Sequence, residues 1–309
     1  MSVSSYNLIT VLGATASGKT SFASNLAYKL KSEIISADSR QVYKRMDIGT
    51  GKDYMDYIVN GKKIPYHIID ILDAGGKYNV YDYQRDFLIA FNNISTKKKI
   101  PILCGGSGMY IEAAVKAYKL IEVPPDEDLR TELDKKSLEE LTKILKSSAK
   151  LHNTSDILSK KRAIRAIEIQ KYYDKHSVKE TEYPVINNIF LGIKFDRDSR
   201  RKRISERLKQ RFDMGMTDEV KSLLDSGIKA ENLIYYGLEY KHITNYLIGN
   251  ISYNRMFAEL ETAIHQFAKR QMTWFRRMEK MGEKIHWIDG YKTMEEKTNI
   301  ALNLLVYSN

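Results

Sequence analysis

The feature that most limits how this chain can fold is a short loop near its N-terminus. Residues 13–20 read Gly-Ala-Thr-Ala-Ser-Gly-Lys-Thr, which fits the pattern G-x-x-x-x-G-K-[ST] at every position. An apolar run precedes the loop and a helical pattern follows it, so the sequence predicts a strand, a phosphate-binding loop and a helix. Backbone N–H groups of such a loop and the N-terminus of the helix attract phosphate oxygens. Lys19 is expected to neutralise a terminal phosphate, and Thr20 to offer its hydroxyl to Mg²⁺.

Strand-like and helix-like segments alternate over the first part of the chain. We expect strands at 6–12, 33–37, 66–72 and 100–104, and helices at 19–30 and 81–97. This alternation predicts a parallel sheet with helices on both faces, whose ligands bind at the carboxyl ends of the strands. Further strands are expected at 188–195 and 284–289, and the longest helix at 253–281. The expected fold class is α/β, a P-loop NTPase-like parallel sheet flanked by helices.

The composition changes near residue 115, where apolar residues begin to recur at helical spacing. Leu133, Leu141 and Leu145 indicate one helical stretch, and Ile164 and Ile167 indicate another. Because this helical region lies between predicted strands, we interpret it as an insertion into the α/β core. We expect residues 1–114 and 188–309 to form the core, with helices in its C-terminal part, and residues 115–187 to form an all-helical insertion domain.

The charge of the chain favours a polyanionic partner. It carries 50 Lys and Arg against 39 Asp and Glu, a net charge of +11. A small phosphorylated metabolite needs only a local positive site, so a chain-wide excess points towards nucleic acid. The single cysteine, Cys104, excludes an intramolecular disulfide framework and a cysteine-built zinc site. Because no apolar run approaches the length of a membrane span and no leader pattern is present, we expect a soluble, cytoplasmic protein.

Asp38 is the main candidate for chemistry outside the loop. It follows the second predicted strand, which places it near the phosphate loop if the first two strands lie close together. A carboxylate there can serve as a general base or as a metal ligand. The alternative is that Asp38 only caps a helix, since Asp is common in first turns. The six histidines show no metal-ligand spacing, and none is assigned to chemistry.

Two predicted helices carry rows of basic residues. In one of them arginines recur every three or four positions and are predicted to share one face, namely Arg200, Arg203, Arg207 and Arg211. Like charges on one face are destabilising unless an anion neutralises them, and a diphosphate or an RNA backbone would do so. The row at 161–165, taken from its residues alone, is more typical of a solvated face.

Six segments in chain order resemble the bacterial tRNA dimethylallyltransferase family, also called the tRNA isopentenyltransferase or IPP transferase family. Beside the phosphate loop they are Ser-Ala-Asp-Ser-Arg-Gln-Val-Tyr at 36–43, Met-Asp-Ile-Gly-Thr at 46–50, Gly-Gly-Ser-Gly-Met-Tyr at 105–110, Arg-Ala-Ile-Arg-Ala-Ile-Glu at 162–168 and Ala-Lys-Arg-Gln-Met-Thr-Trp-Phe-Arg at 268–276. The resemblance covers nearly the whole chain.

This resemblance implies a reaction and its partners. A dimethylallyl group would pass from dimethylallyl diphosphate to the exocyclic amine of the adenosine 3′-adjacent to the anticodon, in tRNAs reading codons that begin with U. Diphosphate would be released and Mg²⁺ would be the cofactor. The phosphate loop would hold the prenyl diphosphate rather than ATP, and the helical insertion would grip the anticodon stem-loop. We also expect a monomer and no membrane partner.

The resemblance also implies roles for individual residues. Asp38 becomes the base that takes a proton from the adenine amine. Thr20 would hold Mg²⁺ or the bridging oxygen of the leaving diphosphate, whose charge Lys19 and an arginine in the turn from Arg207 to Arg211 would neutralise. The implied diphosphate-binding residues are Gly13, Ala14, Thr15, Ala16, Ser17, Gly18, Lys19 and Thr20. The implied tRNA-binding residues are Asp38, Ser39, Arg40, Gln41, Ser107, Arg130, Lys161, Arg162, Ala163, Ile164 and Arg165, which reverses the interpretation of the row at 161–165 as a solvated face.

The sequence departs from the family pattern at three places. Ser107 stands where the family usually has threonine, a change that keeps the hydroxyl. Glu239 stands before Tyr240 where the family tends to have glycine, and the segment 211–217 is shorter than usual. These two departures leave open whether position 239 contacts RNA and which of the two arginines, 207 or 211, contacts diphosphate.

Other functions stay open at this point. A small-molecule kinase would use the same loop for ATP, but it does not explain the basic insertion or the charge of +11. An RNA-binding ATPase would bind RNA without transferase chemistry, and a prenyltransferase for free adenine nucleotides would have little use for the insertion. A glycine-containing turn that binds nothing is the structural alternative for residues 13–20.

Overall fold

A computed structural model of the chain describes residues 6–148, 154–176 and 183–306. The chain divides into two compact units. The first combines Met1–Tyr118 with Pro184–Asn309, and the second is Lys119–Tyr183. Each unit has a hydrophobic core of its own. The insertion expected at 115–187 overlaps the second unit.

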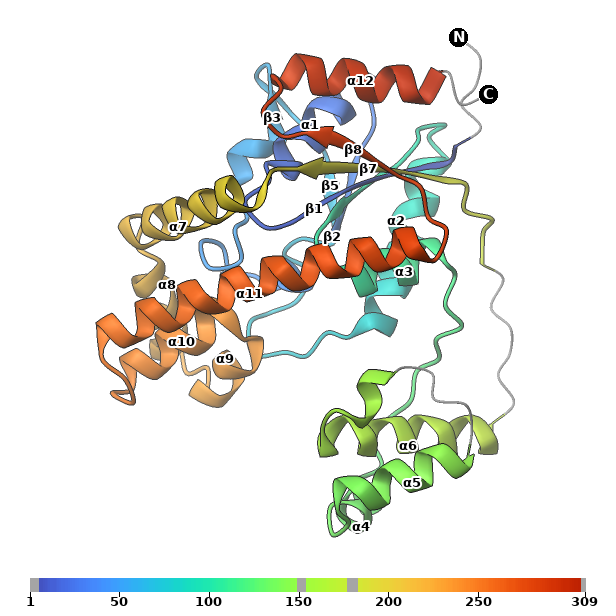
Figure 1. The fold of residues 1–309 in the computed structure, drawn as a ribbon, viewed down its shortest axis with the longest axis vertical. Coiled ribbons are helices and arrows are strands. Elements are labelled where there is room, and N and C mark those ends of the chain that lie inside the picture. The colour runs from blue at the N-terminus through green and yellow to red at the C-terminus, as the bar shows by residue number, and fades with distance from the viewer. Residues whose placement is uncertain (1–5, 149–153, 177–182, 307–309) are drawn as a thin grey trace. The chain divides into compact units, whose positions relative to one another are not determined.

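The first unit is built around a six-stranded parallel sheet with the strand order β5-β2-β6-β1-β7-β8 (Figure 1). All residues of β1 are buried, as expected for a parallel strand that is covered on both faces. The α/β fold class predicted from the sequence is confirmed. The strands of this sheet are β1 (Leu8–Gly13), β2 (Ile34–Ala37), β5 (Tyr66–His67), β6 (Ile102–Gly105), β7 (Asn188–Lys194) and β8 (Ile285–Asp289).

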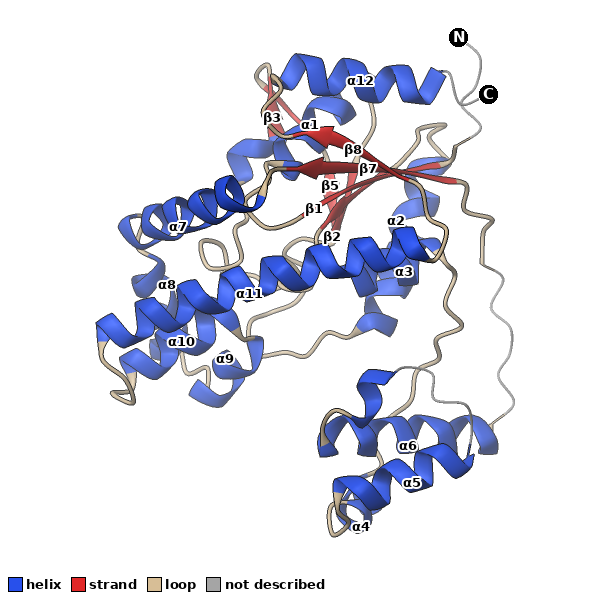
Figure 2. Ribbon diagram, in the orientation of Figure 1, coloured by secondary structure: helices blue, strands red, loops and turns tan. Residues whose placement is uncertain are grey.

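Helices cover both faces of this sheet (Figure 2). On one face lie α1 (Lys19–Leu30) and α12 (Met294–Val306), which pack against each other. On the other lie α2 (Val80–Ser95), α3 (Gly108–Val115) and the long α11 (Tyr253–Lys280). Because side chains alternate along a strand, Ile9 and Val11 of β1 join the same buried cluster as Phe22 of α1 and Ala301 of α12.

Further helices follow β7 and lead to α11. They are α7 (Arg197–Asp213), α8 (Met216–Asp225), α9 (Ala230–Tyr236) and α10 (Leu238–Leu247). α7 begins at a carboxylate cap, since Asp196 accepts the backbone N–H groups of Asp198 and Ser199. α10 packs against α8, α9 and α11. Between β2 and β5 lie a 3₁₀ helix, η1 (Tyr54–Tyr57), and an antiparallel ribbon of β3 (Ile58–Val59) and β4 (Lys62–Lys63).

The second unit is helical. It contains α4 (Glu127–Leu133), α5 (Leu138–Ser148), the 3₁₀ helix η2 (Thr154–Ile157) and α6 (Lys160–Lys175). Its core is a small apolar cluster to which α4, α5 and α6 all contribute. The buried members of that cluster are Leu133, Leu141, Leu145, Ala163, Ile164 and Ile167.

Local structure agrees with the sequence patterns except at one strand. The helix expected at 19–30 has the same bounds in α1. The strand expected at 66–72 is wrong beyond His67, because Ile68 and Asp70 take the left-handed conformation, with φ of 62° and 57°. An extended strand cannot continue through such residues. Over the described ranges, no helix has both the length and the apolar composition that a membrane span requires.

Candidate active site

The phosphate loop, residues 13–20, connects β1 to α1. A side chain at position 13 would place its Cβ 2.7 Å from Ser17 Oγ and 3.1 Å from the carbonyl oxygen of Ile193. Gly18 caps α1 with a φ of 74°, a left-handed conformation that favours glycine. Close packing against Ser17 and β7 therefore favours glycine at position 13, and the backbone conformation favours it at position 18.

A cavity of about 750 Å³ lies beside the phosphate loop. It collects residues from the ends of β2 and β6, from the loop and from α7, although β6 separates β1 from β2 in the sheet. Gly13 and the buried Ala14 are not among its lining residues. The other predicted residues of the first unit all line it, namely Thr15, Ala16, Ser17, Gly18, Lys19, Thr20, Asp38, Ser39, Arg40, Gln41, Ser107, Arg207 and Arg211.

Lys19 is the first residue of α1 and lines the cavity. Burial lowers the pKa of its ammonium group, the charges of Cys104 and Asp38 act to raise that pKa, and Arg207 and Arg211 lower it further. Neighbouring cations thus oppose the charged form of Lys19. A polyanion bound here would remove that repulsion and favour the charged form. The electrostatics are those of a site built for a highly charged anion.

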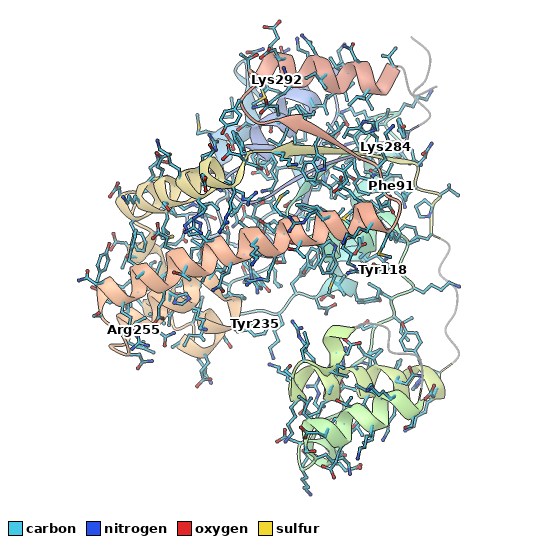
Figure 3. The ribbon with its side chains drawn as sticks, in the orientation of Figure 1. Phe91, Tyr118, Tyr235, Arg255, Lys284 and Lys292 are labelled. Atoms are coloured by element: carbon cyan, nitrogen blue, oxygen red, sulfur yellow. The ribbon has the colours of Figure 1, made fainter. Side chains whose placement is uncertain are left out.

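The arginines of α7 contact the loop and two carboxylates. Arg203 Nε donates to the carbonyl oxygen of Ala16 at 3.0 Å. Arg207 Nη2 lies 2.5 Å from Asp53 Oδ2, and Arg211 Nη1 lies 3.5 Å from Glu239 Oε1. Nitrogen-rich side-chain ends gather between α7 and α11 (Figure 3).

The first of the four arginines lies at a different cavity from the others. Arg200 lines a second cavity of about 720 Å³, together with Arg197 and Arg276. Arg203, Arg207 and Arg211 remain together at the first cavity.

Asp38 and its neighbours form a hydrogen-bonded turn after β2. Asp38 Oδ1 accepts the backbone N–H of Arg40 at 2.9 Å, and the N–H of Ser39 donates to Ser107 Oγ at 3.2 Å. Gln41 Nε2 donates to the carbonyl oxygen of Gly51 at 3.2 Å. The guanidinium of Arg40 lies over the ring of Tyr236, 5.8 Å from its centroid. The turn thus fixes the carboxylate of Asp38 at the cavity.

Gln271 is a site residue whose role the sequence did not predict. Its Oε1 accepts the N–H of Thr15 at 2.8 Å, and its Nε2 donates to the carbonyl oxygen of Gly106 at 3.1 Å. One buried amide on α11 therefore holds the phosphate loop and the end of β6 together. The signal in the sequence was its place in the segment 268–276, one of the six segments that resemble the family.

Glu219 of α8 is a second residue that sequence reasoning missed. Its carboxylate accepts the backbone N–H groups of Asp47, Ile48 and Gly49 at 2.8, 2.7 and 3.0 Å. It also accepts the hydroxyl of Tyr240 at 2.7 Å. The loop after residue 46 is thereby fixed beneath the arginines of α7. A glutamate in an ordinary amphipathic helix carries no sequence signal for such a role.

The predicted RNA-binding residues of the second unit differ in exposure. Ala163 and Ile164 are buried in its core, so their side chains are not presented to a ligand. Arg130 Nε lies 2.9 Å from Glu168 Oε1, and Arg165 also pairs with Glu168 and donates to the carbonyl oxygen of Val123 at 2.8 Å. The side chains of Lys161 and Arg162 are exposed.

Comparison with known proteins gives one consistent family. Residues 41–278 match the family described as IPP transferase. The chain is 58% identical to tRNA dimethylallyltransferase 2 of Phocaeicola vulgatus, over 98% of this chain and 99% of that protein. It is 50% identical to tRNA dimethylallyltransferase 2 of Trichlorobacter lovleyi, over 93% of each chain.

Solved structures agree with this result. The tRNA isopentenylpyrophosphate transferase of Bacillus halodurans is similar, with a TM-score of 0.69 and 30% identity over 97% of this chain and 96% of that one. A eukaryotic dimethylallyltransferase acting on tRNA has a TM-score of 0.77 at 21% identity, over 99% of this chain and 79% of that one. This second likeness concerns the fold.

Proposed function

This chain belongs to the IPP transferase family and transfers a dimethylallyl group to tRNA, and we propose that it does so in the cavity beside the phosphate loop. The observation that carries the proposal is that one cavity unites the phosphate loop, three arginines of α7 and the carboxylate of Asp38. The finer substrate that we propose is the exocyclic amine of the adenosine 3′-adjacent to the anticodon, in tRNAs reading codons that begin with U.

The diphosphate group of the donor fits the cationic side of the cavity. N–H groups of residues 16–20, together with Lys19, Arg207 and Arg211, would bind its oxygens. Negative charge grows on the diphosphate as the bond between the allylic carbon and its oxygen breaks. Fixed cations that face this group stabilise the transition state more than the ground state.

The acceptor amine fits the opposite side, at Asp38. The target base leaves its stack to enter the cavity, with Ser39, Arg40 and Gln41 against the nucleotide. The amine nitrogen attacks the allylic carbon, a C–N bond forms, and diphosphate departs. Asp38 accepts the proton that the nitrogen gives up. Because one oxygen of Asp38 is held by the N–H of Arg40, the carboxylate is already oriented before the base arrives.

Mg²⁺ is the cofactor that we propose, within a family that generally depends on a divalent metal ion. Thr20 lies in the first turn of α1 and lines the cavity, and its hydroxyl is the hard oxygen ligand that Mg²⁺ prefers. No group of three or more His, Cys, Asp or Glu side chains in the described part of the chain could hold an ion by itself. This agrees with an ion held mainly by the diphosphate oxygens, where it would supply positive charge to the leaving group.

The second unit would contact the anticodon stem-loop through Lys161 and Arg162. Both side chains are exposed at the N-terminal end of α6, whereas Arg130 and Arg165 are paired with Glu168. We further propose that the protein acts as a monomer, since one chain supplies the phosphate loop, the arginines and the carboxylate of the cavity. The cytoplasm, where tRNA is processed, is the proposed compartment.

One assay tests this function. The protein is incubated with radiolabelled dimethylallyl diphosphate, Mg²⁺ and unmodified tRNA, with AMP and ATP as competing acceptors. Label in tRNA alone is expected. The Asp38→Ala variant should lose about 100-fold or more of the transfer rate while it binds tRNA within a few-fold of the parent. Label in free nucleotide, or full transfer by Asp38→Ala, would contradict the proposal.

A further inference from the structure

One buried carboxylate of the cavity has no part in the reaction above. Glu239 lies in the first turn of α10, is 9% exposed and lines the cavity. Its Oε1 is 3.5 Å from Nη1 of Arg211. The side chains of the two residues are 12% and 11% exposed, so water screens this pair far less than a surface ion pair. A negative charge on the buried Glu239 therefore repels any anion that binds beside Arg211.

Arg211 has more hydrogen-bond donors than its contact with Glu239 uses. A guanidinium carries five N–H donors, and the long contact with Glu239 engages one nitrogen. Its Nε is buried and has no hydrogen-bond partner among the residues that the structure describes. Burial lowers the pKa of Arg211 and the nearby charge of Arg207 lowers it further, while Glu239 opposes both effects. Buried donors without acceptors are costly, so the site favours an incoming anion that offers several oxygens.

The cations around Glu239 offset only part of the effect of its burial. Burial raises the pKa of its carboxyl group, and the charges of Arg211 and Arg207 lower that pKa by less. Its position in the first turn of a helix also favours the negative form. When a diphosphate engages Arg211, the carboxylate loses its partner and stays close to another anion. The diphosphate therefore competes with a charge that is already in place.

We propose that Glu239 is the counter-ion of Arg211 in the free enzyme and that the diphosphate must displace it. Glu239 thereby weakens the binding of the diphosphate product and speeds its release. The inference rests on the proposed function, because it assumes that the diphosphate lies at Lys19 and Arg211. Asp53 stands in the same relation to Arg207, at 2.5 Å, but its side chain is 45% exposed. Screening by water makes that second competition weaker.

The counter-ion matters most after the reaction. The diphosphate product carries more negative charge than the diphosphate ester of the donor, so cations that stabilise the transition state also hold the product. When the carboxylate of Glu239 pairs with Arg211 again, it opposes the binding of the diphosphate product. Removing its charge should therefore tighten the binding of both diphosphates while it slows turnover.

The decisive variant is Glu239→Gln in the full chain, with Mg²⁺ and inorganic pyrophosphate as the probe. Isothermal titration calorimetry without tRNA should show a dissociation constant about tenfold lower than in the parent, equivalent to about 1.4 kcal/mol. In steady-state prenylation both KM for dimethylallyl diphosphate and kcat should fall. The matched control is Glu231→Gln, which removes an exposed carboxylate from the neighbouring α9 and should change neither quantity.

Opposite results would overturn the inference. If Glu239→Gln binds pyrophosphate no more tightly than the parent, Glu239 only positions Arg211 and does not compete. If Glu239→Gln folds poorly, Glu239→Ala is titrated in its place, and it too should bind pyrophosphate more tightly than the parent. A failure of the proposed function looks different, since pyrophosphate would then bind the parent and Lys19→Met equally well.

Discussion

At the scale of single residues, the environment of a carboxylate decides its role. Glu33 shows this away from the cavity, at the start of β2. Its side chain is 4% exposed and accepts Lys97 Nζ and Lys99 Nζ at 2.9 Å, while His67 Nε2 lies 2.9 Å from its other oxygen. Burial raises the pKa of this carboxyl group, but the three hydrogen bonds outweigh it and lower the pKa to about 2. His67, to which the sequence assigned no chemistry, is a structural partner here.

The depressed pKa of Glu33 predicts how stability depends on pH. The ordinary pKa is 4.5 and the folded value is about 2. The stabilisation is therefore fully present above pH 4.5 and is lost as the pH falls through about 2, and it amounts to about 3 kcal/mol. Glu33→Gln should lower the free energy of unfolding by about this amount at pH 7, and by progressively less below pH 4.5. Urea unfolding of both proteins from pH 7 to pH 2.5 measures the difference, and a difference independent of pH would contradict the assignment.

At the scale of elements, contiguous patterns were predictable and long-range contacts were not. The phosphate loop and α1 follow from residues 13–30 alone, because the strand, the glycines and the helix start are adjacent in the chain. The strand expected at 66–72 was wrong after His67, since Ile68 and Asp70 take the left-handed conformation and end the extended run. Glu219 and Gln271 act on loops 170 and 256 residues away, a relation that no local pattern contains.

Gln271 gives a prediction for α11 as an element. Gln271→Ala removes the acceptor of the Thr15 N–H and the donor to Gly106, so the phosphate loop loses its attachment to α11. KM for dimethylallyl diphosphate should rise about tenfold, with a smaller change in the affinity for tRNA. Gln266→Ala, an exposed amide on the same helix, is the matched control. Weaker tRNA binding with an unchanged KM for the donor would instead indicate that Gln271 contacts RNA.

At the scale of the whole molecule, the chain forms two units with separate hydrophobic cores. The first unit contains every described residue of the cavity, and the second contributes a helical surface with exposed cations. The net charge of +11 had favoured nucleic acid from composition alone. The sequence could not distinguish the cations of α6 that stabilise the unit from those that face solvent, because Glu168, which pairs with Arg130 and Arg165, looks like any other glutamate.

The exposure of Lys161 and Arg162 and the ion pair of Arg165 with Glu168 predict two different phenotypes on α6. Lys161→Ala/Arg162→Ala should weaken tRNA binding and reduce the slope of log K against log [salt] by about 1.5. The reason is that fewer counterions leave the RNA on binding when two phosphate contacts are lost. Arg165→Ala should instead lower the melting temperature, since it leaves the buried Glu168 with one partner fewer. Filter binding across a salt series and thermal unfolding separate the two effects. If the double variant at 161 and 162 keeps the full slope while Arg165→Ala loses it without destabilisation, the RNA is held by the paired arginine and the assignment to the exposed cations is wrong.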